Sequence, residues 1–196
     1  MEFCFATNNE NKLAEVQKML PDTIKLKTLA QIGCSVDLPE TQDTLEGNAQ
    51  QKAQYVFEHF EINCFADDTG LEVYALDNAP GVYSARYAGE QRNNQDNINL
   101  LLKNLQGKHD RKARFRTVIS LVLDGEYFFF EGAIEGQIIN EMRGANGFGY
   151  DSVFVPAGYT KTFAEMTAEE KNQISHRGMA IAKLVAYLSE KFGTDY

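Results

Sequence analysis

The fold is decided by residues 113–130, ARFRTVISLVLDGEYFFF. Alternate side chains from Phe115 to Leu123 share one face of a predicted strand. Asp124-Gly125 is typical of a two-residue β-hairpin turn, and Tyr127–Phe130 is the predicted return strand. Strands joined by so short a turn pair antiparallel, so a sheet that contains this hairpin is not purely parallel.

Predicted strands and helices alternate on both sides of the hairpin. A helix from Asp43 would begin with Asp43 and Glu46 spaced as in a capping box. Together the segments predict an α/β fold with a mixed sheet. The other predicted strands are 2–6, 63–66, near 134–139 and 152–155, and the other helices are 10–20, 93–105 and about 177–191.

Composition limits the function classes. The chain has 196 residues and a formal net charge of −9, so it does not attract nucleic acid or an anionic membrane non-specifically. No apolar run approaches the ~20 residues of a membrane span. The start, Met1 to Ala6, lacks the pattern of a signal peptide. Cys4, Cys34 and Cys64 show no zinc or redox spacing, which favours a reducing compartment. We therefore expect a cytoplasmic protein.

The first candidate site is the predicted strand-to-helix turn Thr7-Asn8-Asn9-Glu10-Asn11-Lys12. Such a turn presents backbone N–H groups at the positive end of a helix, and Lys12 adds a full charge. This arrangement suits a polyphosphate. The alternative is a polar loop in which Asn8 or Asn9 only caps the helix. The glycine pattern of a P-loop is absent.

The second candidate is the acidic pair Asp67-Asp68 at a predicted strand end. Strand alternation would point the two carboxylates to opposite sides. Glu40 lies in another loop ahead of a helix, and oxygen ligands from two loops plus a substrate phosphate are typical of Mg²⁺ binding. The alternative is a turn and a helix cap without a metal.

Two further segments carry candidate binding residues. Gly144–Asp151 places three glycines around two aromatic rings, which suits a close backbone approach and ring stacking but also describes a plain turn. Thr167 and Glu170 are spaced as a capping box, so Lys171 lies on a short helix. Ser175 would cap the last helix, with His176 and Arg177 in its first turn. Basic residues there oppose the helix dipole, which indicates that they face an anion or an acceptor-rich ligand rather than solvent.

Together these segments resemble the inosine triphosphate pyrophosphatase family, whose members hydrolyse non-standard purine nucleoside triphosphates. The resemblance covers residues 2 to about 185, in the family's order. The matching stretches are Thr7-x-Asn9-x-x-Lys12, Glu40-Thr41 with Asn48-Ala49 and Lys52-Ala53, Ala66–Leu71, Pro80–Tyr87, Gly147–Asp151, and Phe163-Ala164-Glu165 through Lys171 to Ser175-His176-Arg177. The chain departs from the family at Gln42-Asp43, Thr69 and Ser152, none of which removes a charged or stacking group.

The resemblance implies a single two-lobed domain over residues 1–196, with a mixed sheet flanked by helices and a cleft for the nucleotide, active as a homodimer. It implies Mg²⁺-dependent hydrolysis of ITP, dITP and XTP to the monophosphate and pyrophosphate. By position, Asp68 is the proton acceptor, and Glu40 and Asp68 hold the metal. The substrate-binding residues carried over, or added from helix spacing, are Thr7, Asn8, Asn9, Glu10, Asn11, Lys12, Lys52, Thr69, Phe148, Gly149, Tyr150, Asp151, Lys171, His176 and Arg177.

Two other functions fit the same residues less well. A sister group of pyrophosphatases acts on pyrimidine or modified nucleotides, but the segments around Phe148 and His176 argue against it. A non-catalytic nucleotide-binding regulator would not require both Glu40 and Asp68.

Overall fold

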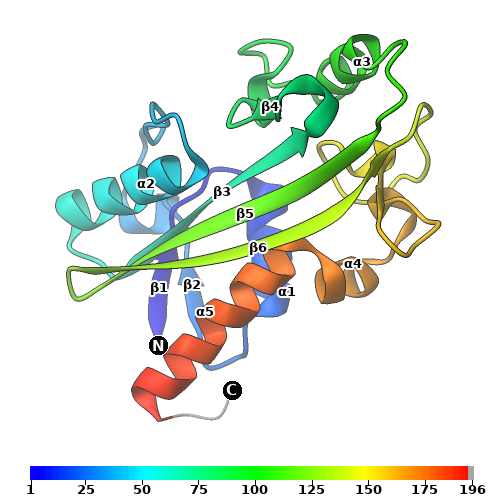
Figure 1. Cartoon of the computed structure of the whole chain (residues 1–196). Helices are drawn as coiled ribbons and strands as arrows, with labels where there is room; N and C mark the ends of the chain where they lie inside the picture. Colours follow the sequence, from blue (N-terminus) through cyan, green and yellow to red (C-terminus); the bar gives the residue numbers. More distant parts are fainter. Residues whose placement is uncertain (194–196) are drawn as a thin grey trace. The chain divides into compact units, whose positions relative to one another are not determined.

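The computed structural model describes residues 1–193, and its centre is a seven-stranded sheet of order β2-β1-β3-β5-β6-β7, with β4 paired to β3 (Figure 1). β1 runs parallel to β2 and β3, whereas β3–β4 and β6–β7 are antiparallel. The predicted α/β fold with a mixed sheet flanked by helices is confirmed. The strands are β1 (Glu2–Phe5), β2 (Lys25–Lys27), β3 (Cys64–Val73), β4 (Pro80–Gly81), β5 (Lys112–Leu123), β6 (Glu126–Ile138) and β7 (Phe154–Pro156).

The helices begin and end close to the predicted positions. They are α1 (Glu10–Met19), α2 (Leu45–Phe60), α3 (Asn94–Asn104), α4 (Ala168–Ile174) and α5 (His176–Phe192). The predicted start of α2 is wrong: Thr44, not Asp43, is its N-cap, and the Thr44 hydroxyl accepts a hydrogen bond from the Gly47 N–H. The capping box of Thr167 and Glu170 before α4 is confirmed.

The hairpin of β5 and β6 is confirmed down to its turn. Asp124 and Gly125 have φ angles of 51° and 85°, the positive values that a type I′ turn requires. The prediction of two separate strands after the turn is wrong, because β6 is continuous from Glu126 to Ile138. Gly136 lies opposite Pro156 of β7, and a Cβ at Gly136 would lie 2.4 Å from the Val155 carbonyl oxygen. Glycine is therefore needed at position 136, where β6 pairs with β7.

Two more boundaries differ from the sequence prediction. β3 continues for ten residues through Asp67 and Asp68, so the two carboxylates lie within a strand and not at its end. β3 pairs with β1 at Cys64 and Phe65, with β4 at Leu71 and Glu72, and with β5, so the strand continues through the polar pair. β7 begins at Phe154, and a 3₁₀ turn at Asp151–Val153 occupies the start of the predicted strand.

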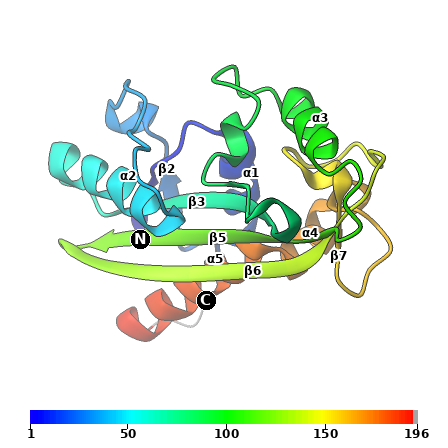
Figure 2. The same cartoon turned by 45° about the horizontal axis from the view of Figure 1, so that its top comes forward.

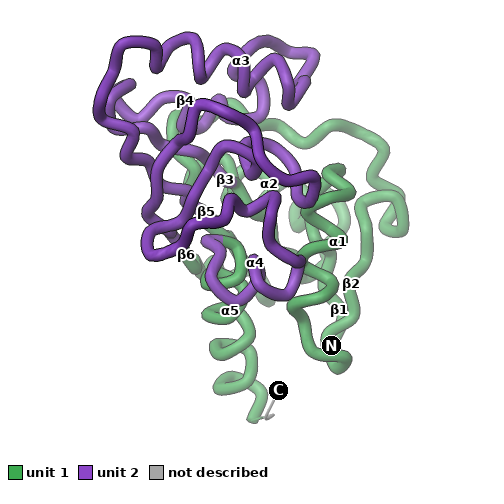
Figure 3. Tube along the Cα trace, turned by 90° about the vertical axis from the view of Figure 1, so that its right-hand side faces the viewer, with its two compact units in different colours: residues 1–68, 117–132, 177–196 green, residues 69–116, 133–176 purple. Residues whose placement is uncertain are grey.

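The chain folds as two compact units (Figure 3). Unit 1 comprises residues 1–68, 117–132 and 177–196, and unit 2 comprises residues 69–116 and 133–176. The division between them therefore falls within β3, β5 and β6 and after the first residue of α5. That the whole chain is one two-lobed domain stays a prediction.

Unit 1 has a hydrophobic core on each face of its strands, with α2 and α5 on opposite sides (Figure 2). One core joins α1 and α5 to Phe5, Phe65 and Ile119. The other core joins α2 to Cys4 of β1 and to Cys64 and Ala66 of β3. The cysteines Cys4, Cys34 and Cys64 are buried and unpaired, as expected for small apolar residues.

Unit 2 has one core of its own. Leu71 and Val73 from β3 pack with Ile98 and Leu101 from α3 and with aromatic rings that include Phe154. The apolar face of α3 therefore lies in this core. Within residues 1–193, no helix is both long and apolar enough to cross a membrane.

Candidate active site

The turn between β1 and α1 is fixed by its own side chains. The Asn9 side-chain oxygen accepts from the N–H groups of Asn11 at 3.0 Å and Lys12 at 3.3 Å. The Thr7 hydroxyl accepts from the Asn9 N–H at 3.1 Å. Asn9 thus caps α1, and binding of a polyphosphate at this turn stays a prediction. Because Asn9 occupies two of the N–H groups at the helix start, the lysine side chain is the stronger candidate for binding an anion here.

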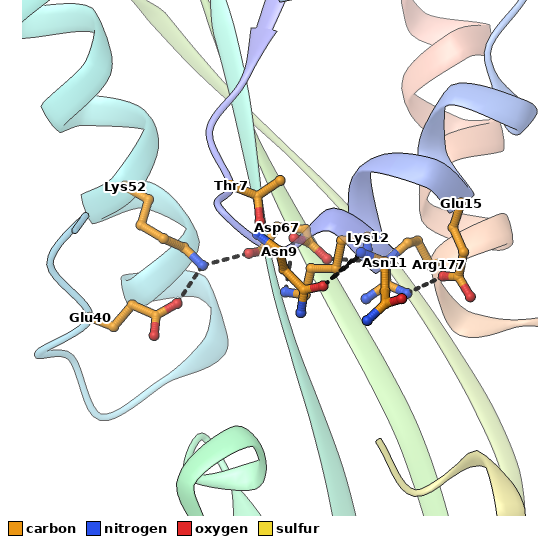
Figure 4. Close-up of polar contacts among 9 residues, drawn as sticks. All are labelled: Thr7, Asn9, Asn11, Lys12, Glu15, Glu40, Lys52, Asp67 and Arg177. Carbon is orange, nitrogen blue, oxygen red and sulfur yellow. Dashed lines mark hydrogen bonds and ion pairs between the residues drawn. The ribbon is translucent and has the colours of Figure 1, made fainter. Parts of the chain in front are cut away.

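Lys12 points from α1 toward β3 rather than toward solvent (Figure 4). Its ammonium donates to Asp67 Oδ1 at 3.0 Å, and its side chain is 14% exposed. Burial lowers the pKa of Lys12, and the neighbouring Asp67 carboxylate opposes that shift. The remaining residues of the turn, Asn8 and Glu10, are exposed.

Asp67 and Asp68 lie on opposite sides of β3, as strand alternation predicts. The Asp67 carboxylate contacts Lys12 of α1 and Arg177 of α5, whereas Asp68 interacts with Asn48 and Lys52 of α2. Burial would raise the pKa of Asp67, but Lys12, Arg177 and Lys52 together hold that pKa well below its usual range. The pKa of Asp68 is raised, mainly because the carboxyl is buried and partly because Glu40 is near.

Lys52 connects α2 to the loop that carries Glu40. Its ammonium donates to Glu40 Oε1 and to the Asp67 backbone oxygen, each at 2.7 Å. Burial would lower the pKa of Lys52, but Asp68, Glu40 and Asp67 raise it overall. The Asn48 side-chain oxygen accepts from the Gln42 N–H at 2.9 Å, so the loop after Glu40 is fastened to α2.

The carboxylates of Glu40 and Asp68 are the candidate metal ligands. They are near enough for Glu40 to raise the pKa of Asp68, a like-charge repulsion that a bound cation relieves. Residues 1–193 contain no group of three or more histidine, cysteine, aspartate or glutamate side chains that could hold a metal ion. Two carboxylates without a complete protein cage suit Mg²⁺, which is usually bound by one or two carboxylates together with substrate phosphates.

A second group of candidate residues lies in unit 2, around the buried carboxylate of Asp151. Asp151 Oδ2 accepts from the Phe148 N–H at 3.0 Å and from the Lys171 ammonium at 2.7 Å. That ammonium also lies 5.0 Å from the centre of the Phe148 ring. Gly147 has a φ of 72°, and a Cβ there would lie 2.2 Å from the same Asp151 oxygen. The glycine-rich loop is therefore folded closely around one ion pair.

The neighbours of this loop are held by other contacts in unit 2. The Tyr150 hydroxyl donates to the Ser84 backbone oxygen at 2.7 Å, and burial raises the pKa of Tyr150. Gly149 has a positive φ of 59°. Thr69, the residue after Asp68 on β3, is half-buried.

His176 and Arg177 open α5, as predicted, and both are buried. The His176 ring stacks on Phe115 with the ring centres 4.7 Å apart. Arg177 Nε donates to Asp67 Oδ2 at 3.2 Å, and its Nη1 donates to Glu15. The anion predicted to face Arg177 is thus, in large part, a pair of carboxylates of the chain itself.

Sequence reasoning missed Glu15 and the central position of Asp67. Glu15 lies three residues after Lys12, which puts both on one face of α1. That spacing is a usable signal, but its partner Arg177 is 162 residues away and only the fold brings the two together.

The comparisons with known proteins agree with each other. The family model described as "Ham1 family" matches residues 3–187. A "dITP/XTP pyrophosphatase" of Flavobacterium johnsoniae is 52% identical over 96% of this chain and 98% of its own length. One of Porphyromonas gingivalis is 56% identical over 94% of this chain and 95% of its own length. The solved structure of the Staphylococcus aureus Ham1 protein has a TM-score of 0.89 at 39% identity, covering 97% of this chain and 100% of that one.

The Asp151–Lys171 pair generates a stability prediction. Asp151→Asn leaves a buried ammonium without its counter-charge and should lower the free energy of unfolding by about 3–5 kcal/mol. Lys171→Met should lower the free energy of unfolding by a similar amount. The double variant should lower it by clearly less than the sum of the two single effects. Urea denaturation measures all three.

The matched control is the exposed pair Lys161–Glu170, whose side chains are 56% and 48% exposed. Lys161→Ala should change the free energy of unfolding by no more than about 1 kcal/mol. Strictly additive effects of the Asp151 and Lys171 substitutions would contradict the ion pair.

Proposed function

Because the chain belongs to the Ham1 family, we propose that it is a nucleoside triphosphate pyrophosphohydrolase that acts on non-canonical purine nucleotides. It hydrolyses ITP, dITP and XTP to the nucleoside monophosphate and pyrophosphate, which removes these nucleotides from the pool. Relatives that match nearly its whole length bear the name dITP/XTP pyrophosphatase. The observation that carries the proposal is the grouping of Lys12, Lys52 and Glu40 around the acidic pair of β3.

Asp68 has the properties of the base in this reaction. Attack of water on the α-phosphorus with pyrophosphate leaving requires an acceptor for the proton of the attacking water. With no cation bound, burial and the neighbouring Glu40 raise the pKa of Asp68. The proton of the water passes to the Asp68 carboxylate as the new P–O bond forms.

The cationic residues of unit 1 neutralise the triphosphate. Lys52 is buried and Lys12 is half-buried, and the carboxylate partner of each fixes the position of its ammonium. The turn that carries Lys12 is formed by Thr7, Asn8, Asn9, Glu10 and Asn11. Thr69 follows the proton acceptor, Asp68, on β3. Glu40 and Asp68 would hold Mg²⁺. When bound, that ion would neutralise charge that develops on the phosphate oxygens.

The remaining candidate residues contact the base and sugar in this proposal. Phe148 offers a ring for stacking, and Asp151 with Lys171 fixes the loop from which that ring projects. Gly149, Tyr150 and His176 complete the set. The enzyme works in the cytoplasm as a homodimer, and the unpaired cysteines support a reducing compartment.

The first test identifies the product. Pyrophosphate, not orthophosphate, should be released directly when ITP, XTP or dITP is supplied with Mg²⁺. ATP, GTP and dUTP serve as comparison substrates in the same assay, and omission of Mg²⁺ tests the cofactor. Formation of the diphosphate before the monophosphate would refute the assignment, and preference for dUTP would favour the pyrimidine-directed alternative.

Asp68→Asn should lower turnover by at least ~10²-fold, because it removes the base and a metal ligand together. Nucleotide affinity should fall much less, since Lys12 and Lys52 remain. Steady-state kinetics with saturating Mg²⁺ measures both. A variant that retains more than about a tenth of the wild-type turnover would show that Asp68 is not the base.

Base choice should depend on hydrogen bonding rather than on stacking. Hypoxanthine and xanthine have an acceptor oxygen at position 6, where adenine has a donor amine. A donor from His176, Arg177 or the 147–151 loop would pair with that oxygen and be left unpaired against adenine, which is costly when buried. Phe148 would stack on any purine.

Phe148→Ala should therefore weaken the binding of ITP and of ATP about equally. Arg177→Ala should reduce the preference for ITP over ATP and lower the turnover of ITP. The measurement is the ratio of kcat/KM for the two nucleotides, with thermal unfolding as a check that the Arg177 variant folds. The opposite pattern, in which only Phe148→Ala changes the ratio, would mean that ring shape decides the choice.

A further inference from the structure

One residue of β3, Asp67, contacts three cations from three helices, two through its carboxylate and one through its backbone oxygen (Figure 4). Its Oδ1 accepts from Lys12 of α1 at 3.0 Å, and its Oδ2 accepts from Arg177 of α5 at 3.2 Å. Its backbone oxygen accepts from Lys52 of α2 at 2.7 Å.

The surroundings of Asp67 suit positioning better than metal binding. Its side chain is only 2% exposed, and each of its two oxygens already accepts from a charged donor. Asp67 also faces α1 and α5, whereas Asp68 and Glu40 interact on the side of α2. The adjacent carboxylates therefore serve different partners.

We propose that Asp67 is a positioning residue that holds the Lys12 ammonium in place for the triphosphate and orients Arg177 at the start of α5. The inference rests on the proposed function, because it assigns Lys12 to phosphate binding. An ammonium has three N–H donors, so the bond to Asp67 fixes its place and leaves donors for phosphate oxygens. A lysine held in this way loses less side-chain freedom when the anion binds.

The mechanism predicts that Asp67 acts on phosphate binding through Lys12. Asp67→Asn removes the charge and turns one acceptor into an amide donor that faces a cation. Affinity for inorganic tripolyphosphate, a probe without base or sugar, should fall at least about tenfold, as expected for loss of one charge-assisted contact. The KM for ITP should rise by a similar factor while kcat changes less.

A double-mutant cycle separates positioning from general damage. Lys12→Ala should weaken tripolyphosphate binding at least about tenfold, and adding Asp67→Asn to it should weaken binding by no more than about twofold further. Glu15→Gln is the matched control: it removes the other carboxylate on Arg177 but leaves the Lys12–Asp67 pair. Its tripolyphosphate affinity should stay within about twofold of the wild type.

Titration calorimetry measures the affinities on the chain of residues 1–196, with thermal unfolding of each variant as the fold check. Should Asp67→Asn not fold, Asp67→Glu retains the charge and moves it by one methylene. That variant should bind tripolyphosphate at least about threefold more weakly if position matters, because the ammonium is displaced. Wild-type affinity in Asp67→Glu would overturn the proposal.

Other results would overturn it too. If the fold-losses of tripolyphosphate affinity caused by Lys12→Ala and by Asp67→Asn multiply in the double variant, Asp67 acts without Lys12. A large rise in the Mg²⁺ concentration for half-maximal activity in Asp67→Asn, with tripolyphosphate binding intact, would make Asp67 a metal ligand instead. Failure of the wild-type chain to release pyrophosphate would refute the proposed function. Wild-type tripolyphosphate affinity in Asp67→Asn, with wild-type activity present, refutes only the positioning role.

Discussion

Burying a cation is tolerated only when a carboxylate lies within hydrogen-bonding distance, and this constraint organises the candidate site. Lys52, Lys171 and Arg177 are all buried, and each is bound to an acidic side chain. The pairs join segments far apart in the chain: Asp67 and Arg177 are separated by 110 residues. The same contacts that compensate for desolvation therefore fix the relative positions of α1, α2 and α5 within unit 1.

This constraint also explains how a chain with a net charge of −9 can be suited to a triphosphate. Each of these cations lies against at least one acidic side chain, and Asp67 serves both Lys12 and Arg177, so the cations can remain charged away from water. A lysine bound to a carboxylate, such as Lys12, still has N–H donors available, because the carboxylate accepts from only some of the three donors of the ammonium. Overall charge governs long-range attraction, whereas binding at short range depends on how these donors are placed.

Much of this arrangement could be predicted from the sequence where the signal is local. The Asp124-Gly125 turn, the Asn9 cap and the Thr167–Glu170 capping box each depend on residues within a few positions of each other. The predicted strand ends were wrong where polar residues lie inside a strand. Asp67-Asp68 within β3 and the polar middle of β6 interrupt the apolar pattern, but the strands continue through them. The role of Glu15 depends on Arg177, so no local pattern contains it.

Asp67 and Asp68 show why residue type alone does not assign a role. The two are identical and adjacent, but the alternation of β3 gives them different surroundings. Lys12 and Arg177 keep the pKa of Asp67 low, so it remains a fixed anion through the range in which enzymes work. Burial beside Glu40 raises the pKa of Asp68, so the two carboxyl groups differ in their affinity for a proton. A strand is well suited to this division, because a single peptide step moves a carboxylate from one environment to the other while the backbone between them stays rigid.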